Sequence, residues 1–318
     1  MIEGKRVFIT GGAGFIGSTI AARLVDRNQV VIYDNFYRDS ISSKSFRNHP
    51  HLEVVKGDVL DYSALSKAMS GADIVVHCAA IAGIDTVIQH PVSTMRVNMI
   101  GSANVLDAAS RLPNCQRVLC FSTSEVFGQF AFRSVETDNA VVGELGQARW
   151  VYAVSKVAVE HLAMGYFTEK SLPITVLRPF NVYGPGQIGE GALKTFVSSA
   201  LQNKPIEIHG DGTQIRAWCY VDDLADCVML TIDHPKAIGE SFNVGNQRAI
   251  VTIYGLANIV VRVLNSQSTI TFSKKDYVDV EIRVPSVRKA QQLLGFQAKV
   301  ELEDGIRRTA EYYRNKLP

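Results

Sequence analysis

Residues 10–17 read Thr-Gly-Gly-Ala-Gly-Phe-Ile-Gly, with glycines at positions 11, 14 and 17 in the spacing G-x-x-G-x-x-G. An apolar run ending at Ile9 precedes this stretch, and residues 18–25 follow it with helical apolar spacing. Glycines between a strand and a helix let the backbone approach a ligand, and the free N–H groups of the helix attract negative charge. The stretch predicts a pyrophosphate site, although glycines also occur in plain tight turns.

A second apolar run, Val30–Tyr33, ends in Asp34. An acid at the end of the second strand of such a unit accepts hydrogen bonds from the hydroxyls of an adenosine ribose. Asp34 therefore favours NAD over NADP. Arg38 lies close by in the sequence and is suited to a 2′-phosphate instead, and an ordinary strand-end role for Asp34 stays open.

Composition narrows the class of protein. The chain has 318 residues, is 47% hydrophobic and carries a net charge of +2, which gives no electrostatic reason to expect nucleic-acid or membrane binding. Its five cysteines show no CxxC pair or metal-ligand spacing, so we expect reduced thiols, no metal and a cytoplasmic location. The first residues lead directly into a strand, which does not fit a signal peptide.

Apolar runs alternate with helical stretches, including 91–112 and 150–170, through the first half of the chain. This alternation predicts an α/β fold with a doubly wound parallel sheet of the Rossmann type. We expect the NAD-binding domain at 1–180, with a return segment at about 217–245. The segments 181–216 and 246–318 are expected to form a smaller mixed α/β region that binds substrate. The further strands are expected at 52–55, 74–78, 117–121 and 174–177.

Tyr152 and Lys156 are four residues apart at the start of a predicted helix and therefore face the same side. An ammonium beside a phenol lowers the phenol pKa, so that the phenolate can take a proton from a sugar hydroxyl. The pairs Tyr166–Lys170 and Tyr312–Lys316 have the same spacing. We prefer Tyr152 because it follows the strand-end cluster Ser122-Thr123-Ser124 by about one crossover, and those hydroxyls are candidates to bind the substrate hydroxyl. The expected catalytic residues are Thr123, Ser124, Glu125, Tyr152 and Lys156.

Taken together, these motifs resemble the extended short-chain dehydrogenase/reductase family. The resemblance spans nearly the whole chain and includes TGGAGFIG at 10–17, HCAA at 77–80, RPFNVYGP at 178–185 and HGDGTQIR at 209–216. It implies an NAD-dependent epimerase, dehydratase or decarboxylase acting on a nucleoside-diphosphate sugar. The residues it implies at the cofactor are Gly11, Gly14, Phe15, Ile16, Gly17, Asp34, Asn35, Asp58, Val59, Ala79, Ala80, Asn98, Ser122, Tyr152, Lys156 and Pro179.

The same resemblance implies that members first oxidise C4 of the sugar, and residues around C5 and C6 then decide the reaction. Glu125, next to Thr123 and Ser124, has no use in a simple 4-epimerase, whereas a dehydratase or a decarboxylase needs such a group. Segments 149–156 and 279–286 look like the decarboxylase domain of the bacterial polymyxin-resistance enzyme. We therefore expect a UDP-glucuronate decarboxylase, with a 4,6-dehydratase second and a 4-epimerase third. The alternative for Glu125 is that it is an ordinary surface charge at the start of a helix.

Four residues are expected to bind the substrate. The resemblance places Asn181, Arg216 and Arg283 at the diphosphate or sugar, where arginine forks match phosphate oxygens. Arg149, just before the tyrosine, is expected to meet a C6 carboxylate. Uridine is the expected base, with thymidine and guanosine open. A non-catalytic dinucleotide sensor is the alternative to an enzyme, and a homodimer through 91–112 and 150–170 is the expected assembly.

Overall fold

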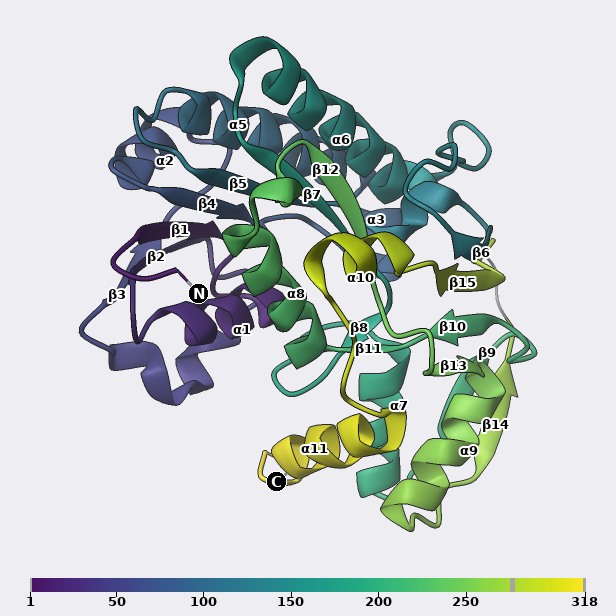
Figure 1. Cartoon of the computed structure of the whole chain (residues 1–318). Coiled ribbons are helices and arrows are strands. Elements are labelled where there is room, and N and C mark those ends of the chain that lie inside the picture. Colours follow the sequence, from purple (N-terminus) through teal and green to yellow (C-terminus); the bar gives the residue numbers. More distant parts are fainter. Residues whose placement is uncertain (1, 275–277, 317–318) are drawn as a thin grey trace.

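A seven-stranded parallel sheet forms the centre of the N-terminal part of the chain (Figure 1), in the order β12-β7-β5-β4-β1-β2-β3. The computed structural model describes residues 2–274 and 278–316. The predicted strands are all present, so the α/β, doubly wound sheet is confirmed. The strands are β1 (Arg6–Thr10), β2 (Gln29–Asp34), β3 (Leu52–Lys56), β4 (Ile74–His77), β5 (Arg117–Phe121), β7 (Ile174–Pro179) and β12 (Glu240–Val244).

Alternation along the strands supplies two cores, because successive side chains point to opposite faces of a sheet. Val7 and Ile9 of β1 pack with buried residues of α1 (Phe15–Leu24), α8 (Val221–Asp233) and α10 (Arg288–Leu294). Phe8 packs on the other face, with α2 (Tyr62–Met69), α5 (Ser102–Ser110) and α6 (Val151–Lys170). Helices on both faces leave the carboxyl ends of the parallel strands as the edge at which a ligand can bind.

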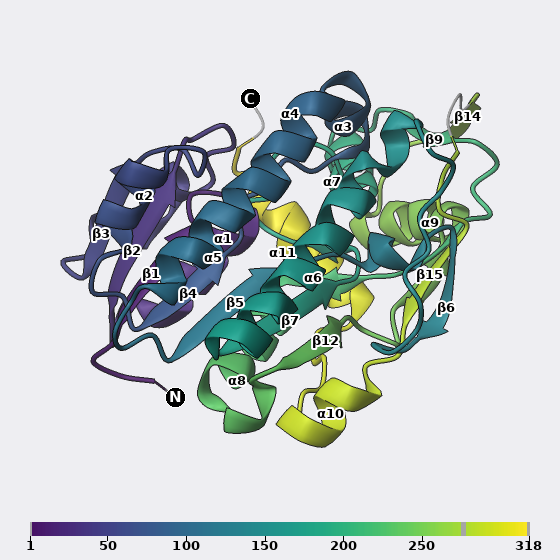
Figure 2. The ribbon, with the colours of Figure 1, turned by 90° about the horizontal axis from the view of Figure 1, so that it is seen from above.

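The predicted helix at 91–112 consists of three consecutive parts. These are α4 (Pro91–Met95), the π-helical turn η3 (Arg96–Gly101) and α5. Figure 2 shows this helical stretch and α6 running side by side over the sheet. Val92, Ile100 and Leu162 on these helices are exposed apolar side chains. They fit the expected homodimer, which stays a prediction.

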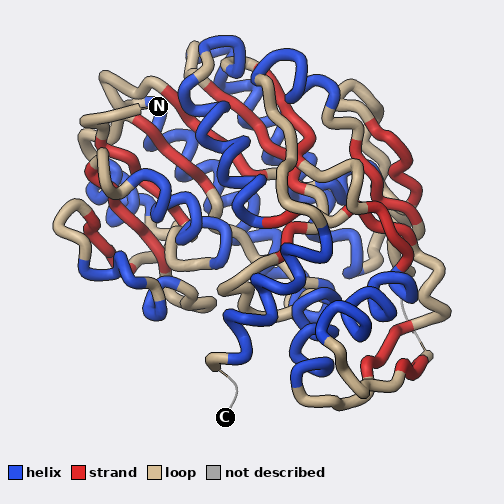
Figure 3. The backbone as a smooth tube through the Cα atoms, turned by 60° about the horizontal axis from the view of Figure 1, so that its bottom comes forward, coloured by secondary structure: helices blue, strands red, loops and turns tan. Residues whose placement is uncertain are grey.

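A second group of strands lies apart from the large sheet, at the right of Figure 3. It is a four-stranded sheet in the order β13-β10-β15-β6. Its strands are β13 (Ile250–Thr252), β10 (Ile215–Ala217), β15 (Ile282–Pro285) and β6 (Phe130–Ser134). Two further sheets have two strands each: β8 (Val182–Tyr183) pairs with β11 (Cys219–Tyr220), and β9 (Ile206–His209) pairs with β14 (Ile270–Ser273). The remaining α-helices of the described residues are α3 (Ile84–Gln89), α7 (Ala192–Leu201), α9 (Ile253–Leu264) and α11 (Leu302–Arg314).

Chain crossings join the two parts. After β10, the chain returns to the large sheet through α8 and β12, and β12 pairs with β7. Residues 290–298 also contribute to the core against α1 and α8, and β6, from the N-terminal part, pairs with β15 in the smaller sheet. The domain limits stay a prediction. Of the helices in the described ranges, none has the length and apolar character needed to cross a bilayer.

Candidate active site

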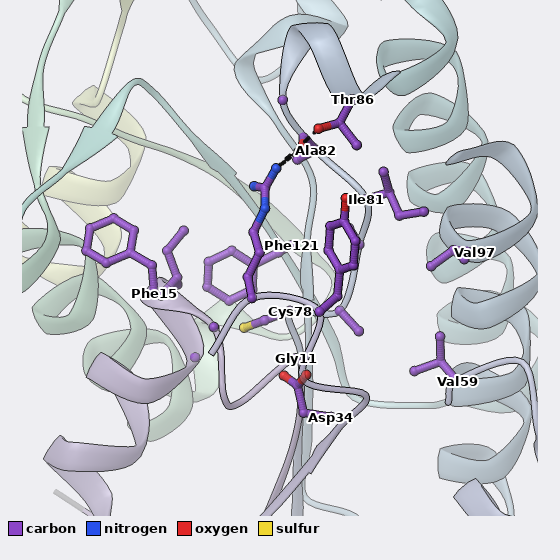
Figure 4. A pocket seen from close by; sticks show the side chains of 18 of the residues that line it. Gly11, Phe15, Asp34, Val59, Cys78, Ile81, Ala82, Thr86, Val97 and Phe121 are labelled. Atoms are coloured by element: carbon purple, nitrogen blue, oxygen red, sulfur yellow. Dashed lines mark hydrogen bonds between the residues drawn. The ribbon is translucent and has the colours of Figure 1, made fainter. Parts of the chain in front are cut away.

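A cavity of about 610 Å³ opens at the carboxyl ends of the parallel strands (Figure 4). Fifteen of the sixteen predicted cofactor residues line it, and Asn98 is the exception. Thr123, a predicted catalytic residue, lines it as well. The fold thus brings the glycine turn, the acid after β2 and the Tyr152–Lys156 pair to one space. Their contacts with NAD stay a prediction.

The glycine turn has the backbone that a dinucleotide phosphate requires. Gly11 has a φ of +68°, and a Cβ there would lie 2.6 Å from the Ala79 nitrogen, so only glycine fits. Asp34 accepts hydrogen bonds from the Ala13 nitrogen at 2.9 Å and the Phe36 nitrogen at 2.7 Å, which fixes the turn against β2. Its burial raises the pKa of the Asp34 carboxyl. The turn and the acid therefore fit NAD, with the pyrophosphate over the start of α1 and the ribose at Asp34.

Arg38 does not turn toward Asp34. Its Nη2 donates to the Ala82 carbonyl at 2.9 Å and to Thr86 Oγ1 at 3.5 Å. In this position Arg38 offers no fork to a 2′-phosphate beside Asp34. The arrangement agrees with the expected preference for NAD.

Tyr152 and Lys156 meet at the inner end of the cavity. Lys156 Nζ donates to the Phe121 carbonyl at 2.7 Å and lies 5.9 Å from the centre of the Tyr152 ring. We expected the ammonium to lower the phenol pKa. In the structure, burial and the negative charge of Glu125 raise the pKa of Tyr152 and outweigh Arg283 and a hydrogen bond with Thr123. Bound NAD would supply the hydride acceptor. The positive charge of its oxidised nicotinamide ring would also favour the phenolate form of Tyr152.

Lys156 is itself a buried cation, and burial lowers its pKa to about 8. In the unfolded chain a lysine has a pKa of about 10.4, so the unfolded state binds more protons between these two values. The contribution of Lys156 therefore makes the free energy of unfolding rise with pH across that window. Below the window Lys156 is protonated in both states and adds no pH dependence. We expect the free energy of unfolding of the wild type, minus that of Lys156→Met, to increase by about 3 kcal/mol from pH 7.5 to pH 10.5. Urea titrations at several pH values measure this difference, and a flat difference contradicts it.

The two other tyrosine–lysine pairs lie elsewhere. Tyr312 and Lys316 are joined at 2.6 Å near the end of α11, in an exposed position. Neither they nor Tyr166 and Lys170 line the cavity. The choice of Tyr152 thus agrees with the geometry of the cavity.

The predicted hydroxyl cluster is divided between two environments. Ser122 lines the cavity and donates to Glu160, which in turn accepts from Arg178 Nη2 at 2.6 Å. Thr123 lines the cavity and caps the short helix that follows, accepting from the Glu125 nitrogen at 3.2 Å. Ser124 is buried and is not among the lining residues. Thr123 is accordingly the hydroxyl best placed beside Tyr152.

Asn98 lies beneath the cavity wall. Its side chain accepts from the Ile81 nitrogen at 2.8 Å and donates to the Ile81 carbonyl at 3.1 Å and to Ser155 Oγ at 3.0 Å. It is fully buried within the π-helical turn η3. Asn98 therefore positions the loop after β4 and links it to α6, and direct contact with NAD stays a prediction.

Glu125 belongs to a buried cluster of ions that adjoins Tyr152. Arg149 Nη1 donates to Glu125 Oε2 at 2.7 Å, and Arg283 Nη2 lies 3.3 Å from Glu125 Oε1. Asp279 lies 3.6 Å from Arg149 Nη2 and 3.3 Å from Arg216 Nη2. The arginines hold the pKa of Glu125 below its usual value despite burial. A surface charge at Glu125 is thus excluded, since its side chain is only 13% exposed.

Among the residues that the structure describes, this cluster contains three arginines, Arg149, Arg216 and Arg283, and two carboxylates, Glu125 and Asp279. Among the described residues, Arg283 Nε is buried and has no hydrogen-bond acceptor, and Arg283 Nη2 lies 3.3 Å from Glu125 Oε1 without forming a hydrogen bond. Burying a cation without its full set of acceptors is costly. These five residues are not among those that line the cavity. The charges of Glu125 and Arg283 nevertheless act on Tyr152, so the arrangement suits an anionic substrate group held next to Tyr152.

The other predicted substrate residues already have protein partners. Arg216 Nη2 also donates to the Val280 carbonyl at 2.5 Å, and Arg149 stacks over the Trp150 ring at 5.1 Å. Asn181 Nδ2 donates to the Ala217 carbonyl at 2.8 Å, which ties the end of β7 to β10. Their contacts with substrate stay predictions. Asp279 is a member of this cluster that the sequence does not predict as a site residue, although it lies in segment 279–286, which carries the resemblance.

Comparison with known proteins identifies the relatives of this chain. The profile of the NAD dependent epimerase/dehydratase family matches residues 7–245. The UDP-N-acetyl-alpha-D-glucosaminuronate decarboxylase of Bacillus cytotoxicus is 33% identical over 320 residues, covering 98% of each chain. UDP-glucuronic acid decarboxylase 2 of Arabidopsis thaliana is also 33% identical, over 99% of this chain and 69% of its own length.

A solved structure shares the whole fold. The UDP-glucuronic acid 4-epimerase from Bacillus cereus, in complex with UDP-glucuronic acid and NAD, superposes with a TM-score of 0.90 at 27% identity. The match covers 98% of this chain and 100% of that one. These relatives agree with the NAD site and with nucleotide-sugar chemistry.

Proposed function

The chain belongs to the NAD dependent epimerase/dehydratase family, and we propose that it decarboxylates a UDP-linked hexuronate, with UDP-glucuronate as its first substrate. The family is NAD-dependent, and the relatives reported above are named for UDP-sugar substrates. The choice among decarboxylation, dehydration and epimerisation is our proposal. The relatives named above include two decarboxylases of UDP-uronates.

The proposal rests on the buried ion cluster beside Tyr152, in which the described residues include three arginines and two carboxylates. A neutral hexose brings no charge to these arginines, whereas the carboxylate of a hexuronate is an anionic partner for them. Arg283 has a donor to receive it, since its Nε lacks an acceptor in the part of the chain that the structure describes, while its Nη2 lies 3.3 Å from Glu125 Oε1. Arginine and a carboxylate form the stronger, charge-assisted class of hydrogen bond.

The residues have defined tasks in this reaction. Tyr152 takes the proton of the C4 hydroxyl as the hydride leaves C4, and Lys156 holds the phenolate by its charge. The resulting ketone makes the sugar a β-keto acid, so the bond between C5 and C6 breaks and its electron pair forms an enolate. A proton from solvent then bonds to C5, and we assign its delivery to Glu125, whose charge acts on Tyr152. Return of the hydride to C4 and of the Tyr152 proton to the C4 oxygen gives a UDP-pentose, with carbon dioxide already released and no net redox change.

A second substrate has a specific observation in its favour. The Bacillus cytotoxicus relative covers 98% of this chain and is named for UDP-N-acetylglucosaminuronate. The two sugars share the C4 hydroxyl and the C6 carboxylate on which the chemistry depends. We therefore place UDP-N-acetylglucosaminuronate second.

The test is a panel of four nucleotide sugars incubated with the protein and NAD. UDP-glucuronate and UDP-N-acetylglucosaminuronate test decarboxylation, UDP-glucose tests 4-epimerisation and dTDP-glucose tests 4,6-dehydration. We expect a UDP-pentose from the first, identified by mass spectrometry. A UDP-galacturonate product without carbon dioxide would make the protein an epimerase, and a 4-keto-6-deoxy sugar would make it a dehydratase.

A further inference from the structure

Three segments that are far apart in the sequence meet at the wall of the cavity. Arg38 follows β2, Ala82 and Thr86 surround the start of α3, and Glu190 precedes α7; all four line the cavity. Figure 4 shows Ala82 and Thr86 at the top of the view, with Gly11 and Asp34 below. These segments therefore face the glycine turn across the cavity.

The hydroxyl of Thr86 lies at the centre of this junction. It donates to Glu190 Oε1 at 2.8 Å, and it accepts from Arg38 Nη2 at 3.5 Å. Arg38 Nη2 also donates to the Ala82 carbonyl at 2.9 Å. We call Arg38, Thr86 and Glu190 the clasp, since they join the loop after β2 to the start of α3 and to the loop before α7.

Backbone contacts of Glu190 reinforce the clasp. Its carboxylate accepts from the Asp85 nitrogen at 3.0 Å and the Thr86 nitrogen at 3.1 Å. A Cβ at Gly83, where φ is +106°, would lie 2.7 Å from Glu190 Oε1. Only glycine at position 83 leaves room for the carboxylate and adopts this backbone conformation at low cost.

The loop that carries Glu190 is also held from behind. Ser40 Oγ donates to the Gly186 carbonyl at 2.7 Å, and Tyr313 Oη donates to the Gln187 carbonyl at 2.6 Å. The loop before α7 is thus fixed on one side to the segment after β2 and on the other to α11. A ligand leaving between these segments has to separate several hydrogen bonds together.

We propose that the clasp retains NAD in the cavity between turnovers. This inference rests on the proposed function, in which the hydride returns to the same sugar and the cofactor has no need to leave. In the described ranges, both hydrogen bonds of Arg38 use Nη2. Its Nη1 and Nε thus remain as donors for the pyrophosphate that the glycine turn is built to hold.

Release of the cofactor tests the clasp without reference to turnover. The protein is loaded with NADH, excess NAD is added, and the loss of NADH fluorescence gives the dissociation rate. Thr86→Val removes the central hydroxyl while keeping the shape of the side chain, and Glu190→Gln removes the charge that binds two backbone N–H groups. We expect each variant to release NADH about tenfold faster than the wild type. Thr86→Val loses two hydrogen bonds of the clasp, and Glu190→Gln loses the negative charge and one of the two acceptor oxygens.

Two controls separate this role from a general loss of structure. Thr86→Ser keeps the hydroxyl and is expected to release NADH at close to the wild-type rate. Thr168→Val removes a hydroxyl whose hydrogen bond, among the described residues, is to the Met164 carbonyl of the same helix, and it is expected to leave the NADH release rate unchanged. Wild-type release from both Thr86→Val and Glu190→Gln, with unaltered circular dichroism, overturns the clasp. That result leaves the proposed reaction intact, because decarboxylation in excess NAD is measured separately.

Discussion

Replacing Tyr152 with phenylalanine is expected to lower turnover of UDP-glucuronate about a thousandfold, which is within the range for loss of a positioned acid–base group. The phenol oxygen is the group that takes the C4 proton, and the ring alone still fills the space beside Lys156 and Thr123. NADH binding is therefore expected to stay close to that of the wild type. Product formation, followed by chromatography of the nucleotide sugars, measures the loss, and fluorescence titration measures the binding.

Tyr166→Phe is the matched control, because Tyr166 lies on the same helix and also has a lysine, Lys170, four residues later. It does not line the cavity, so the variant should retain wild-type turnover. If Tyr152→Phe keeps full activity, Tyr152 is not the proton acceptor. The non-catalytic sensor then becomes the better description of the Tyr152 site.

Replacing Glu125 with glutamine is the second change with a large expected effect. Glutamine cannot control the C5 proton, and we expect turnover to fall about a hundredfold or more. It also leaves Arg149 and Arg283 without their carboxylate, and breaking a buried ion pair from one side costs about 3 kcal/mol or more in stability. Initial rates and urea unfolding of the same preparation measure the two losses.

Glu53→Gln is the control for Glu125, since Glu53 forms an exposed ion pair with Arg6. Exposed pairs contribute little, so both its rate and its stability should match the wild type. A Glu125→Gln variant that is destabilised but fully active would limit Glu125 to a structural role. In that case the proposal for the C5 proton would have to move to another residue.

Much of the cofactor site follows from the sequence because parallel sheets impose it. Strands such as Val30–Tyr33 are recognisable as apolar runs, and the residues after them converge at one edge whatever the details of packing. The turn with Gly11 and the acid at Asp34 therefore lie in the cavity as expected. Asn98 differs because a π-helical turn in the predicted helix directs its amide to Ile81 and Ser155, and nothing in the spacing indicates that turn.

The surroundings of Glu125 and the clasp depend on contacts between distant segments. Glu125 meets Arg283, and Thr86 meets Glu190, only after the chain has crossed between its two parts. Contacts between distant segments leave no local pattern in the sequence. The sequence therefore indicates which charged residues are candidates for the site, but not which residues they pair with. Arg149 illustrates the consequence: the expected partner was a substrate carboxylate, and the structure places Glu125 at 2.7 Å from it.

The proposed decarboxylation is best tested by following the fate of the C6 carboxylate of UDP-glucuronate. The protein is incubated with NAD and UDP-glucuronate labelled isotopically at that carbon, in heavy water. We predict that labelled carbon dioxide forms in the same amount as a UDP-pentose that carries one solvent deuterium at C5, and that NADH does not accumulate. A product that retains the labelled carboxylate would contradict it.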